Sequence, residues 1–314
     1  MLAGDVLTPG LQGDHRKRGN STQALQSARR TGNLEGMTRI AIIGGGNIGE
    51  ALIAGLVADG IDPKNIIVAN RSEDRLTELA DRYGVLIAED SVTATVEADI
   101  LFNCVKPDGT LSVFDEVAEQ LDDNDTTTVA VSVAAGVTIG AMENVLPAGT
   151  PVVRVMPNTP MLVGKGTSAI AGGRFATKEQ LETVRELLAK VGTAVVVKEK
   201  DIDAVTAVSG SGPAYFFLVA EAMVDAGVNL GLPRALAEKL AIGTAEGAAQ
   251  MMANGLAEGG DGPVELRAKV SSPGGTTSMA TRTLEEEGLR RAFFRAMEAC
   301  RDRSVELGAP PKGD

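Results

Sequence analysis

The chain has 314 residues, enough for two domains that each have a core of their own. Its net charge of −12 argues against nucleic acid and anionic lipid as partners, because an acidic surface repels both. One histidine, His15, and two distant cysteines, Cys104 and Cys300, offer no ligand set for a metal and no histidine-based catalytic triad.

Residues 1–36 are rich in Gly, Ser, Gln and Arg and have no apolar segment of the kind found in secretory signals. We expect a disordered leader there, with Met37 as an alternative start and a targeting leader as an alternative function. The longest uncharged run, 204–220, contains two serines, two glycines and a proline between residues 209 and 213, which argues against a membrane span. A cytoplasmic protein is the expectation.

From residue 38 the chain alternates apolar runs with helical patterns. Two early helices are expected, one over 47–59 and one from Ser72, a good N-cap, to Tyr83, where Gly84 ends it. The expected strands are 38–44, 66–69, 99–105, 127–133, 151–155 and 193–197. Most of these runs are continuously apolar, as in strands covered on both faces, so they predict an α/β, mainly parallel, doubly wound sheet of the Rossmann type.

A glycine pattern joins the first strand to the first helix. Residues 44–49 have the sequence GGGNIG, which matches G-x-G-x-x-G at Gly44, Gly46 and Gly49. Gly44 would make the tight turn, Gly46 would admit a pyrophosphate, and Gly49 would let the helix pack on the sheet. The pattern alone fits any glycine-rich turn, but a strand before it and a helix after it are the context of a dinucleotide site. We expect Gly44, Gly46, Asn47, Ile48 and Gly49 to bind a nucleotide cofactor.

The end of the second strand indicates which cofactor binds. An NAD site places an acidic residue there, whereas this chain has Asn70, Arg71 and Ser72. An amide, a guanidinium and a hydroxyl suit a 2′-phosphate, so we expect NADPH to be preferred over NADH. The alternative is an exposed turn in which Ser72 only caps the next helix.

Two further strand ends are expected to border the cofactor: Val105, Lys106 and Pro107, and then Ala134, Ala135 and Gly136. Small residues at the second of these let the nicotinamide ribose lie close to the backbone. Lys106 is either a solvated surface charge or a group near the nicotinamide. Cys104 is expected to be a packed core residue rather than a nucleophile.

After residue 200 the strand pattern stops, and the helical patterns cover 203–208, 214–226, 232–253, 264–270, 277–287 and 289–307. Many positions are Ala or Gly, including Gly243 and Gly247, which permits close contact between helices. We therefore expect a cofactor-binding domain of residues 37–200 and an all-α domain of residues 201–314 that binds substrate and interlocks with a second copy. Tight packing within one subunit is the alternative.

Two loops in this half carry hydroxyls and glycines. Residues 270–277, VSSPGGTT, precede an expected helix and offer backbone N–H groups and hydroxyls at the positive end of its dipole, which can hold a small carboxylate. Residues 209–215, SGSGPAY, form either a turn with Pro213 at the first helical position or part of a substrate pocket. Tyr215 is expected to anchor its helix, with proton donation as the alternative.

These segments together resemble the pyrroline-5-carboxylate reductase family. The resemblance covers about residues 38–308 and rests on GGGNIG (44–49), VKP (105–107), AAGVTI (134–139), MPNTP (156–160), DAVTAVSGSGPAY (203–215), GLP (231–233) and VSSPGGTT (270–277). It implies a Rossmann domain, a C-terminal helical dimerisation domain, and dimers that assemble further into a ring. It also implies hydride transfer from NADPH, or NADH, to C5 of 1-pyrroline-5-carboxylate, which gives L-proline in the last step of its biosynthesis.

The resemblance assigns roles as well. It places the substrate carboxylate and ring nitrogen in a loop that matches Ser272, Gly275, Thr276 and Thr277, and it puts Glu199 close to the substrate. It places the cofactor on the glycine turn and the strand ends already named, with Val133, Ala134 and Ala135 as the contacts after the fifth strand. Thr277 is the expected catalytic residue, with a hydroxyl that bonds the ring nitrogen and assists its protonation.

The chain departs from the family pattern at Ser91, where Asn is frequent, at Ala268, where an acidic residue is common, and at Thr281, where Leu is usual. The first departure puts a contact near the adenosine ribose in doubt. Three other functions stay open. A β-hydroxyacid dehydrogenase would need a lysine within 205–230, which has none. The others are a reductase with another cyclic imine or a deazaflavin partner, and a nucleotide sensor without activity.

Overall fold

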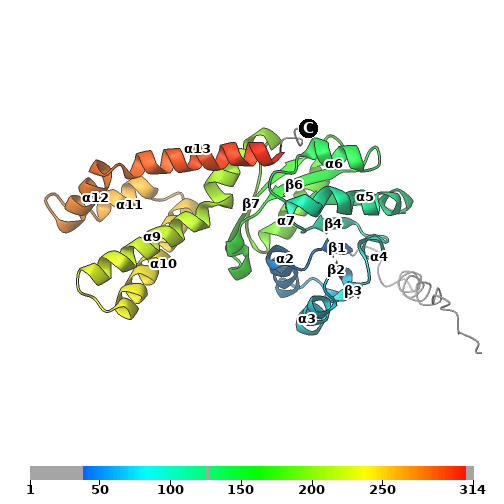
Figure 1. The fold of residues 1–314 in the computed structure, drawn as a ribbon, viewed down its shortest axis with the longest axis horizontal. Coiled ribbons are helices and arrows are strands. Elements are labelled where there is room, and N and C mark those ends of the chain that lie inside the picture. The colour runs from blue at the N-terminus through cyan, green and yellow to red at the C-terminus, as the bar shows by residue number, and fades with distance from the viewer. Residues whose placement is uncertain (1–37, 125–126, 309–314) are drawn as a thin grey trace, which may run out of the picture.

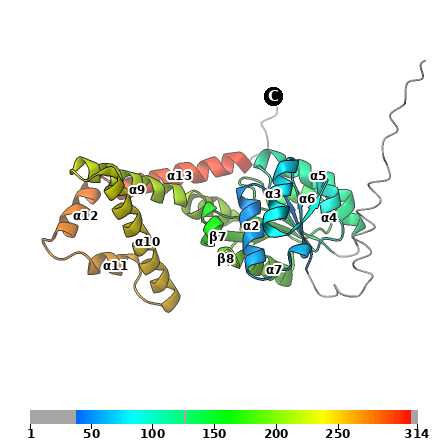
Figure 2. The ribbon, with the colours of Figure 1, turned by 90° about the horizontal axis from the view of Figure 1, so that it is seen from below.

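The computed structural model describes residues 38–124 and 127–308, so the expected leader lies outside the described residues. An α/β part and a helical part lie next to each other along the long axis of the molecule (Figure 1). The same division is visible after a quarter turn (Figure 2).

The α/β part is built on one eight-stranded sheet with the order β3-β2-β1-β4-β5-β6-β7-β8. All neighbouring strands are parallel except β6 and β7. The strands are β1 (Ile40–Ile43), β2 (Ile66–Ala69), β3 (Leu86–Ala88), β4 (Ile100–Asn103), β5 (Val129–Ser132), β6 (Val152–Met156), β7 (Gly166–Gly172) and β8 (Gly192–Val196). The expected mainly parallel, doubly wound sheet is confirmed.

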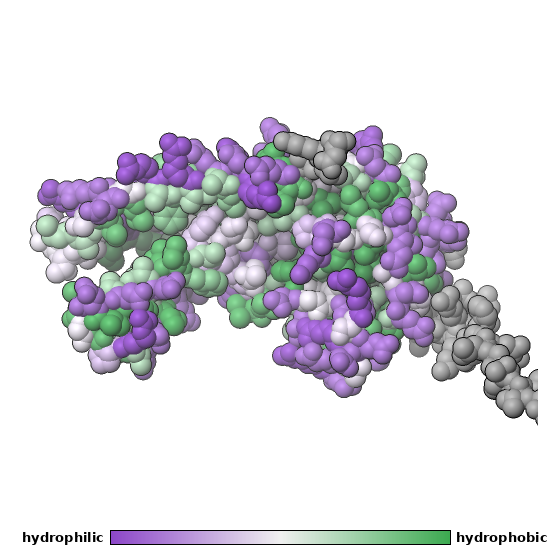
Figure 3. Space-filling view, viewed as in Figure 1, coloured by the Kyte–Doolittle hydropathy of each residue, from purple (hydrophilic) through white to green (hydrophobic). Residues whose placement is uncertain are grey.

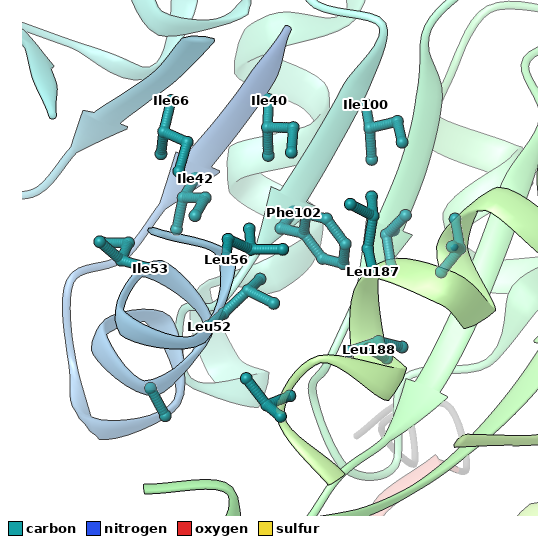
Figure 4. Close-up of a cluster of buried hydrophobic side chains, with 14 of the residues drawn as sticks. Ile40, Ile42, Leu52, Ile53, Leu56, Ile66, Ile100, Phe102, Leu187 and Leu188 are labelled. Carbon is teal, nitrogen blue, oxygen red and sulfur yellow. The ribbon is translucent and has the colours of Figure 1, made fainter. Parts of the chain in front are cut away.

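Helices cover both faces of this sheet, which explains the continuously apolar strands. Ile42 and Phe102 contribute to one buried cluster, together with α2 (Asn47–Ala58), α3 (Glu73–Tyr83) and α7 (Lys178–Ala189) (Figure 4). Ala41 and Leu101, their neighbours on the same strands, belong to a second cluster with α4 (Ser91–Thr95), α5 (Pro107–Asp123) and α6 (Ile139–Val145). Successive residues of a strand point to opposite faces, so both must be apolar.

The helical part leaves the sheet after β8. Its elements are η3 (Glu199–Asp201), α8 (Ile202–Val205), the π-helical turn η4 (Thr206–Gly210), α9 (Gly212–Asn229), α10 (Arg234–Glu258), α11 (Pro263–Lys269), α12 (Thr276–Glu286) and α13 (Leu289–Gly308). The last helix returns to the junction of the two parts, where the Ser304 hydroxyl donates to Asp203 Oδ1 at 2.7 Å. The expected all-α domain is confirmed.

The helical part has many exposed large apolar side chains and a small buried cluster. Its buried cluster consists of Val224, Ala237 and Ala241, while Phe217 is 67% exposed and Phe294 70%. Green patches along the helices in Figure 3 show this surface. A side chain added at Gly243 or Gly247 would meet nothing within 4 Å, so these two glycines do not serve close packing within one subunit. By length and composition the helical segment Glu199–Asn229 could span a membrane, and 22% of its most apolar window is buried.

Candidate active site

The carboxyl ends of four neighbouring strands meet at one edge of the sheet. Ile43, the last residue of β1, pairs with Ala69 of β2 and with Asn103 of β4, and Asn103 pairs with Ser132 of β5. This register brings the predicted segments 44–49, 70–72, 105–107 and 133–135 to the same edge. The edge includes the switch point between β1 and β4, where dinucleotides bind in sheets of this type.

Gly44 makes the predicted tight turn and Gly49 allows the predicted close packing of the helix, while Gly46 leaves open space. Gly44 has a φ of +101°, and a Cβ there would lie 2.9 Å from the carbonyl carbon of Cys104. A Cβ at Gly49 would lie 2.1 Å from the carbonyl oxygen of Gly44, so only glycine lets α2 approach the turn. Gly46 is exposed, and a Cβ there would meet nothing within 4 Å. The space in front of Gly46 and the first N–H groups of α2, which have no partner within the helix, fit a pyrophosphate.

Two of the three predicted cofactor-binding side chains in the turn after β2 already make hydrogen bonds within the protein. The Asn70 side chain accepts from the Gly45 N–H at 3.1 Å and donates to the Ser72 carbonyl at 3.3 Å. Ser72 Oγ accepts from the Arg75 N–H at 3.4 Å and caps α3, so the capping role of Ser72 is confirmed. Arg71 is exposed and has no hydrogen bond or ion pair with the described residues. Of the three predicted groups, Arg71 is therefore the one available to a 2′-phosphate.

Two buried polar residues that the sequence analysis missed shape the other strand ends. Asn103 donates to the Thr110 carbonyl at 3.0 Å and accepts from the Val105 N–H at 3.3 Å, which fixes the turn that leads into Pro107 and α5. Ser132 Oγ accepts from the Ala134 N–H at 3.2 Å. Their signal in the sequence is a polar residue that ends an otherwise apolar strand.

Lys106 and Cys104 differ in their surroundings at this edge. Lys106 is exposed at the N-terminus of α5. Cys104 packs against the cluster under α2, and burial raises the pKa of its thiol to about 12. A thiol with that pKa forms almost no thiolate at neutral pH, so the expectation of a core residue rather than a nucleophile is confirmed.

The predicted substrate loop connects α11 to α12. Its Gly275 N–H donates to the Ser272 carbonyl at 3.0 Å, and a Cβ at Gly275 would lie 2.4 Å from Ser272 Oγ. Gly275 is the N-cap of α12, so Thr276 and Thr277 begin the helix and their N–H groups have no partner within it. The Thr277 hydroxyl has no hydrogen bond with the described residues and is half-buried. The loop can therefore offer N–H groups and a free hydroxyl to a small anion.

Glu199 is not near this loop in the same chain. Its Oε1 accepts from the N–H of Ile139, the first residue of α6, at 2.6 Å and from the buried Arg154 guanidinium at 3.4 Å. Arg154 Nη2 is also 3.8 Å from Asp203 Oδ1. Glu199 thus ties the start of the helical part to β6 and α6.

Tyr215 anchors α9, as predicted. Its hydroxyl donates to the Ala207 carbonyl at 3.1 Å, and its ring meets Phe293 of α13 edge to face at 6.1 Å. Burial and the neighbouring Cys300 raise the pKa of Tyr215, which makes its hydroxyl a weaker acid.

Within one chain the cofactor edge and the substrate loop do not meet. The connection between α11 and α12 lies at the end of the helical part that is remote from the sheet (Figure 1 and Figure 2).

Comparisons with known proteins cover nearly all described residues. A family described as pyrroline-5-carboxylate reductase dimerisation matches residues 199–307. Pyrroline-5-carboxylate reductase of Corynebacterium melassecola is 59% identical over 272 residues, 87% of this chain and 99% of the relative. The enzyme of Escherichia coli (strain K12) is 39% identical over 270 residues, 86% of this chain and 98% of the relative. This chain belongs to the pyrroline-5-carboxylate reductase family.

Solved structures of the family agree with this fold. A pyrroline-5-carboxylate reductase from Coxiella burnetii has a TM-score of 0.80 at 37% identity and covers 87% of this chain and 100% of its own. Plasmodium falciparum pyrroline carboxylate reductase with NADP bound has a TM-score of 0.75 at 29% identity and covers 87% and 100%. Residues 39–136 also match a family described as coenzyme F420-dependent NADP oxidoreductase. The predicted NADP-binding domain is thereby confirmed.

The family expected from the sequence is confirmed, and with it the reduction of 1-pyrroline-5-carboxylate to L-proline with NAD(P)H. Relatives matched over nearly their whole length are reductases of this family, which decides against a β-hydroxyacid dehydrogenase. The apolar segment Glu199–Asn229 falls within the residues matched by the dimerisation family.

Proposed function

We propose that this chain reduces 1-pyrroline-5-carboxylate in a site built from two copies of the chain. One copy contributes the cofactor edge of its domain 37–200, and a second copy contributes the loop 272–277 from its domain 201–314. The observation that carries the proposal is the separation of these two parts in a single chain (Figure 1). A reaction that needs the ring of the substrate against the nicotinamide requires them to be adjacent.

The exposed apolar face of the helical part supports pairing of two copies. Phe216, Phe217 and Leu218 on α9 are each more than 60% exposed, and the glycines at 243 and 247 on α10 leave room for a neighbouring helix. Apolar patches of this kind on a soluble domain mark interaction surfaces. We propose a homodimer through this face, with further assembly into a ring as the family resemblance implies, in a cytoplasmic protein.

The cofactor edge is proposed to hold NADPH through four segments. The N–H groups around Gly46, Asn47 and Ile48 hold the pyrophosphate at the positive end of α2, with Gly44 and Gly49 fixing the turn. Arg71, at the exposed end of β2, pairs with the 2′-phosphate and favours NADPH over NADH. The segments 105–107 and 133–135 line the nicotinamide side. NADPH supplies the hydride when it is bound.

The substrate loop is proposed to hold the ring. The first N–H groups of α12 and the hydroxyls of Ser272 and Thr276 bind the carboxylate, and Gly275 lets the backbone come close. The Thr277 hydroxyl bonds the ring nitrogen, orients the ring and assists its protonation. Hydride delivery to C5 of an iminium removes charge and creates no oxyanion, so the residues mainly position the ring and exclude water. We propose that Glu199 acts close to the substrate by holding α6 beside 133–135.

Mixed dimers test the shared site. A Gly46→Asp chain loses the cofactor edge and a Thr277→Ala chain loses the loop, and two different tags allow dimers with one copy of each to be purified. If two copies share each site, such a dimer has one intact site and about half the parent activity.

The reciprocal mixture is the control. In this mixture the parent chain is paired with the double variant Gly46→Asp/Thr277→Ala. If two copies share each site, this dimer has no intact site. Sites complete within one chain would give the opposite pattern, with half activity in this second dimer and little in the first, and would refute the proposal. NADPH oxidation is measured with 1-pyrroline-5-carboxylate, beside NADH and a six-membered imine acid.

A further inference from the structure

A cluster of charged residues lies behind the glycine turn and has no role in the site as described. Glu50, in the first turn of α2, accepts hydrogen bonds from Arg82 at 2.8 Å and from the Tyr83 hydroxyl at 2.9 Å, and it pairs with Arg75. These three partners of Glu50 all lie on α3: Arg75, Arg82 and Tyr83. The Nε of Arg75 donates to the Gly45 carbonyl at 2.8 Å.

Two successive peptide units of the turn are therefore held, one by Asn70, which follows β2, and one by Arg75 of α3. The Gly45 N–H is bonded to Asn70 Oδ1 and the Gly45 carbonyl to Arg75 Nε. A trans peptide is planar, and its N–H points away from its C=O. The carbonyl of Gly45 faces Arg75, so the N–H of Gly46 in the same peptide unit points away from Arg75. That N–H has no hydrogen bond with the described residues, and the side of Gly46 is open.

Glycine makes this support necessary. Three consecutive glycines have the widest backbone freedom in the chain, and ordering them costs free energy when a ligand binds. A turn that already has its ligand-bound conformation binds the ligand without this cost in free energy.

Arg75 is poorly placed to bind a phosphate itself. Its Nη1 is 2.6 Å from Glu78, its Nη2 pairs with Glu50, and its Nε is taken by the Gly45 carbonyl. Burial opposes ionisation of Glu50, but hydrogen bonds from Arg75 and Tyr83 and the nearby Arg82 outweigh it and hold the pKa of Glu50 below its usual range. The carboxylate thus stays charged and paired with the guanidinium at neutral pH.

We propose that Arg75, held by Glu50, is a positioning residue for the cofactor: it turns the Gly45–Gly46 peptide so that the Gly46 N–H faces the pyrophosphate. This inference rests on the proposed cofactor site at residues 44–49. The pyrophosphate is common to NADPH and NADH, so Arg75 supports both cofactors equally. Arg71 acts only on the 2′-phosphate.

The test compares affinities for NADPH and NADH, titrated against parent, Arg75→Lys and Arg75→Ala. Lysine keeps the charge but cannot bond Gly45, Glu50 and Glu78 together. Each variant should weaken both cofactors about 5- to 50-fold, the range of one lost charge-assisted hydrogen bond that acts indirectly. The ratio of the two affinities should stay within about twofold of the parent ratio, and the KM for the imine at saturating NADPH should be unchanged.

Two further variants complete the design. Glu78→Gln removes the partner of Arg75 that does not contact α2 or the glycine turn, and it should bind both cofactors like the parent. Arg71→Ala should weaken NADPH alone, which shows that the ratio reports the 2′-phosphate. If Arg75→Ala does not fold, Arg75→Lys carries the same comparison.

Three results would overturn the inference. Loss of NADPH affinity alone in Arg75→Lys would make Arg75 a ligand of the 2′-phosphate. Unchanged affinity for both cofactors would mean that the turn does not need Arg75, while the proposed site would stand. A parent that binds neither cofactor would refute the proposed site itself.

Discussion

Substitution by alanine should have different effects at two glycines of the turn. At Gly49 it should lower the stability of the fold, and at Gly46 it should weaken cofactor binding. An alanine Cβ at Gly49 would lie 2.1 Å from the Gly44 carbonyl oxygen, and Cβ contacts under 3.0 Å are essentially never seen. The oxygen has little freedom to move, because the N–H of the same planar peptide unit, that of Gly45, donates to Asn70 Oδ1 at 3.1 Å. Helix α2 must therefore shift by about 0.9 Å (3.0 − 2.1) away from the turn.

That shift disturbs the buried contacts of Leu52 and Leu56 with the sheet. Overpacking of this kind costs about 1–3 kcal/mol, which corresponds to a Tm lower by roughly 2–12 °C in a domain of this size. Gly46 has a φ of −73° and a ψ of −169°, which alanine adopts freely, and its Cβ would meet nothing. Gly46→Ala should keep or slightly raise the Tm and should still weaken NADPH at least about tenfold, because the methyl fills the approach of the pyrophosphate.

The assay is a melting curve by circular dichroism, followed by titration of NADPH fluorescence. Two outcomes would refute the reasoning. If Gly49→Ala melts like the parent, the contact with the Gly44 carbonyl does not limit the position of α2. If Gly46→Ala binds NADPH like the parent, the pyrophosphate does not approach Gly46.

Further predictions concern single side chains. Thr277→Ala should lower kcat about 10- to 150-fold through loss of one hydrogen bond to a charged group, with an unchanged Tm and recovery in Thr277→Ser; unchanged turnover would remove Thr277 from the mechanism. Cys104, with a thiol pKa of about 12, should resist alkylation in the folded protein at pH 8 and react only after unfolding, as peptide mapping would reveal. The pKa of Glu50 is lowered from its ordinary value of 4.5, so its ion pairs stabilise the fold above pH 4.5 and lose this effect as the pH falls through the lowered value. Glu50→Gln should flatten the pH dependence of the Tm in that acidic range, and an unchanged slope would contradict this account.

The features that the sequence revealed are those fixed by local chemistry. Apolar runs located six of the strands, and the glycine spacing located the tight turn between β1 and α2. Two strands were missed for physical reasons. The strand β3 has three residues, with Ile87 half exposed, and β7 has the sequence GTSAIAG, whose small and polar residues have weak strand preference.

Several helix ends differ from the predicted ones, most of all the end of α10, and the long-range contacts of single side chains could not be predicted from the sequence. The helical pattern was expected to end at residue 253, but α10 continues to Glu258 and its C-cap is Gly259, which has a φ of +65°. A glycine is required at 255 because a Cβ there would lie 2.2 Å from the Asp261 carbonyl oxygen, so Gly255 marks a close approach and not a helix end. The contact of Arg75 with Gly45 joins residues 30 positions apart and has no periodic signal.

We expect the helical part to depend on a second copy of the chain for its own stability, which leads to a prediction about concentration. A buried cluster of Val224, Ala237 and Ala241 is small for a helical unit of this length, and the exposed Phe217 shows where the missing apolar contacts would form. If a second copy supplies them, folding of this part is linked to association by mass action. Helical circular dichroism and activity should then fall together on dilution.

Phe217→Asp places a charge in the proposed interface and should raise the concentration at the midpoint of this loss at least about tenfold. Phe175→Asp is the matched control, because Phe175 is 47% exposed on the α/β part, and it should leave the midpoint unchanged. Full activity in a species that sedimentation shows to be a monomer would refute both the pairing and the shared site. The sheet clusters are complete within one chain, so the α/β part should keep its fold and bind NADPH at dilutions where activity has gone.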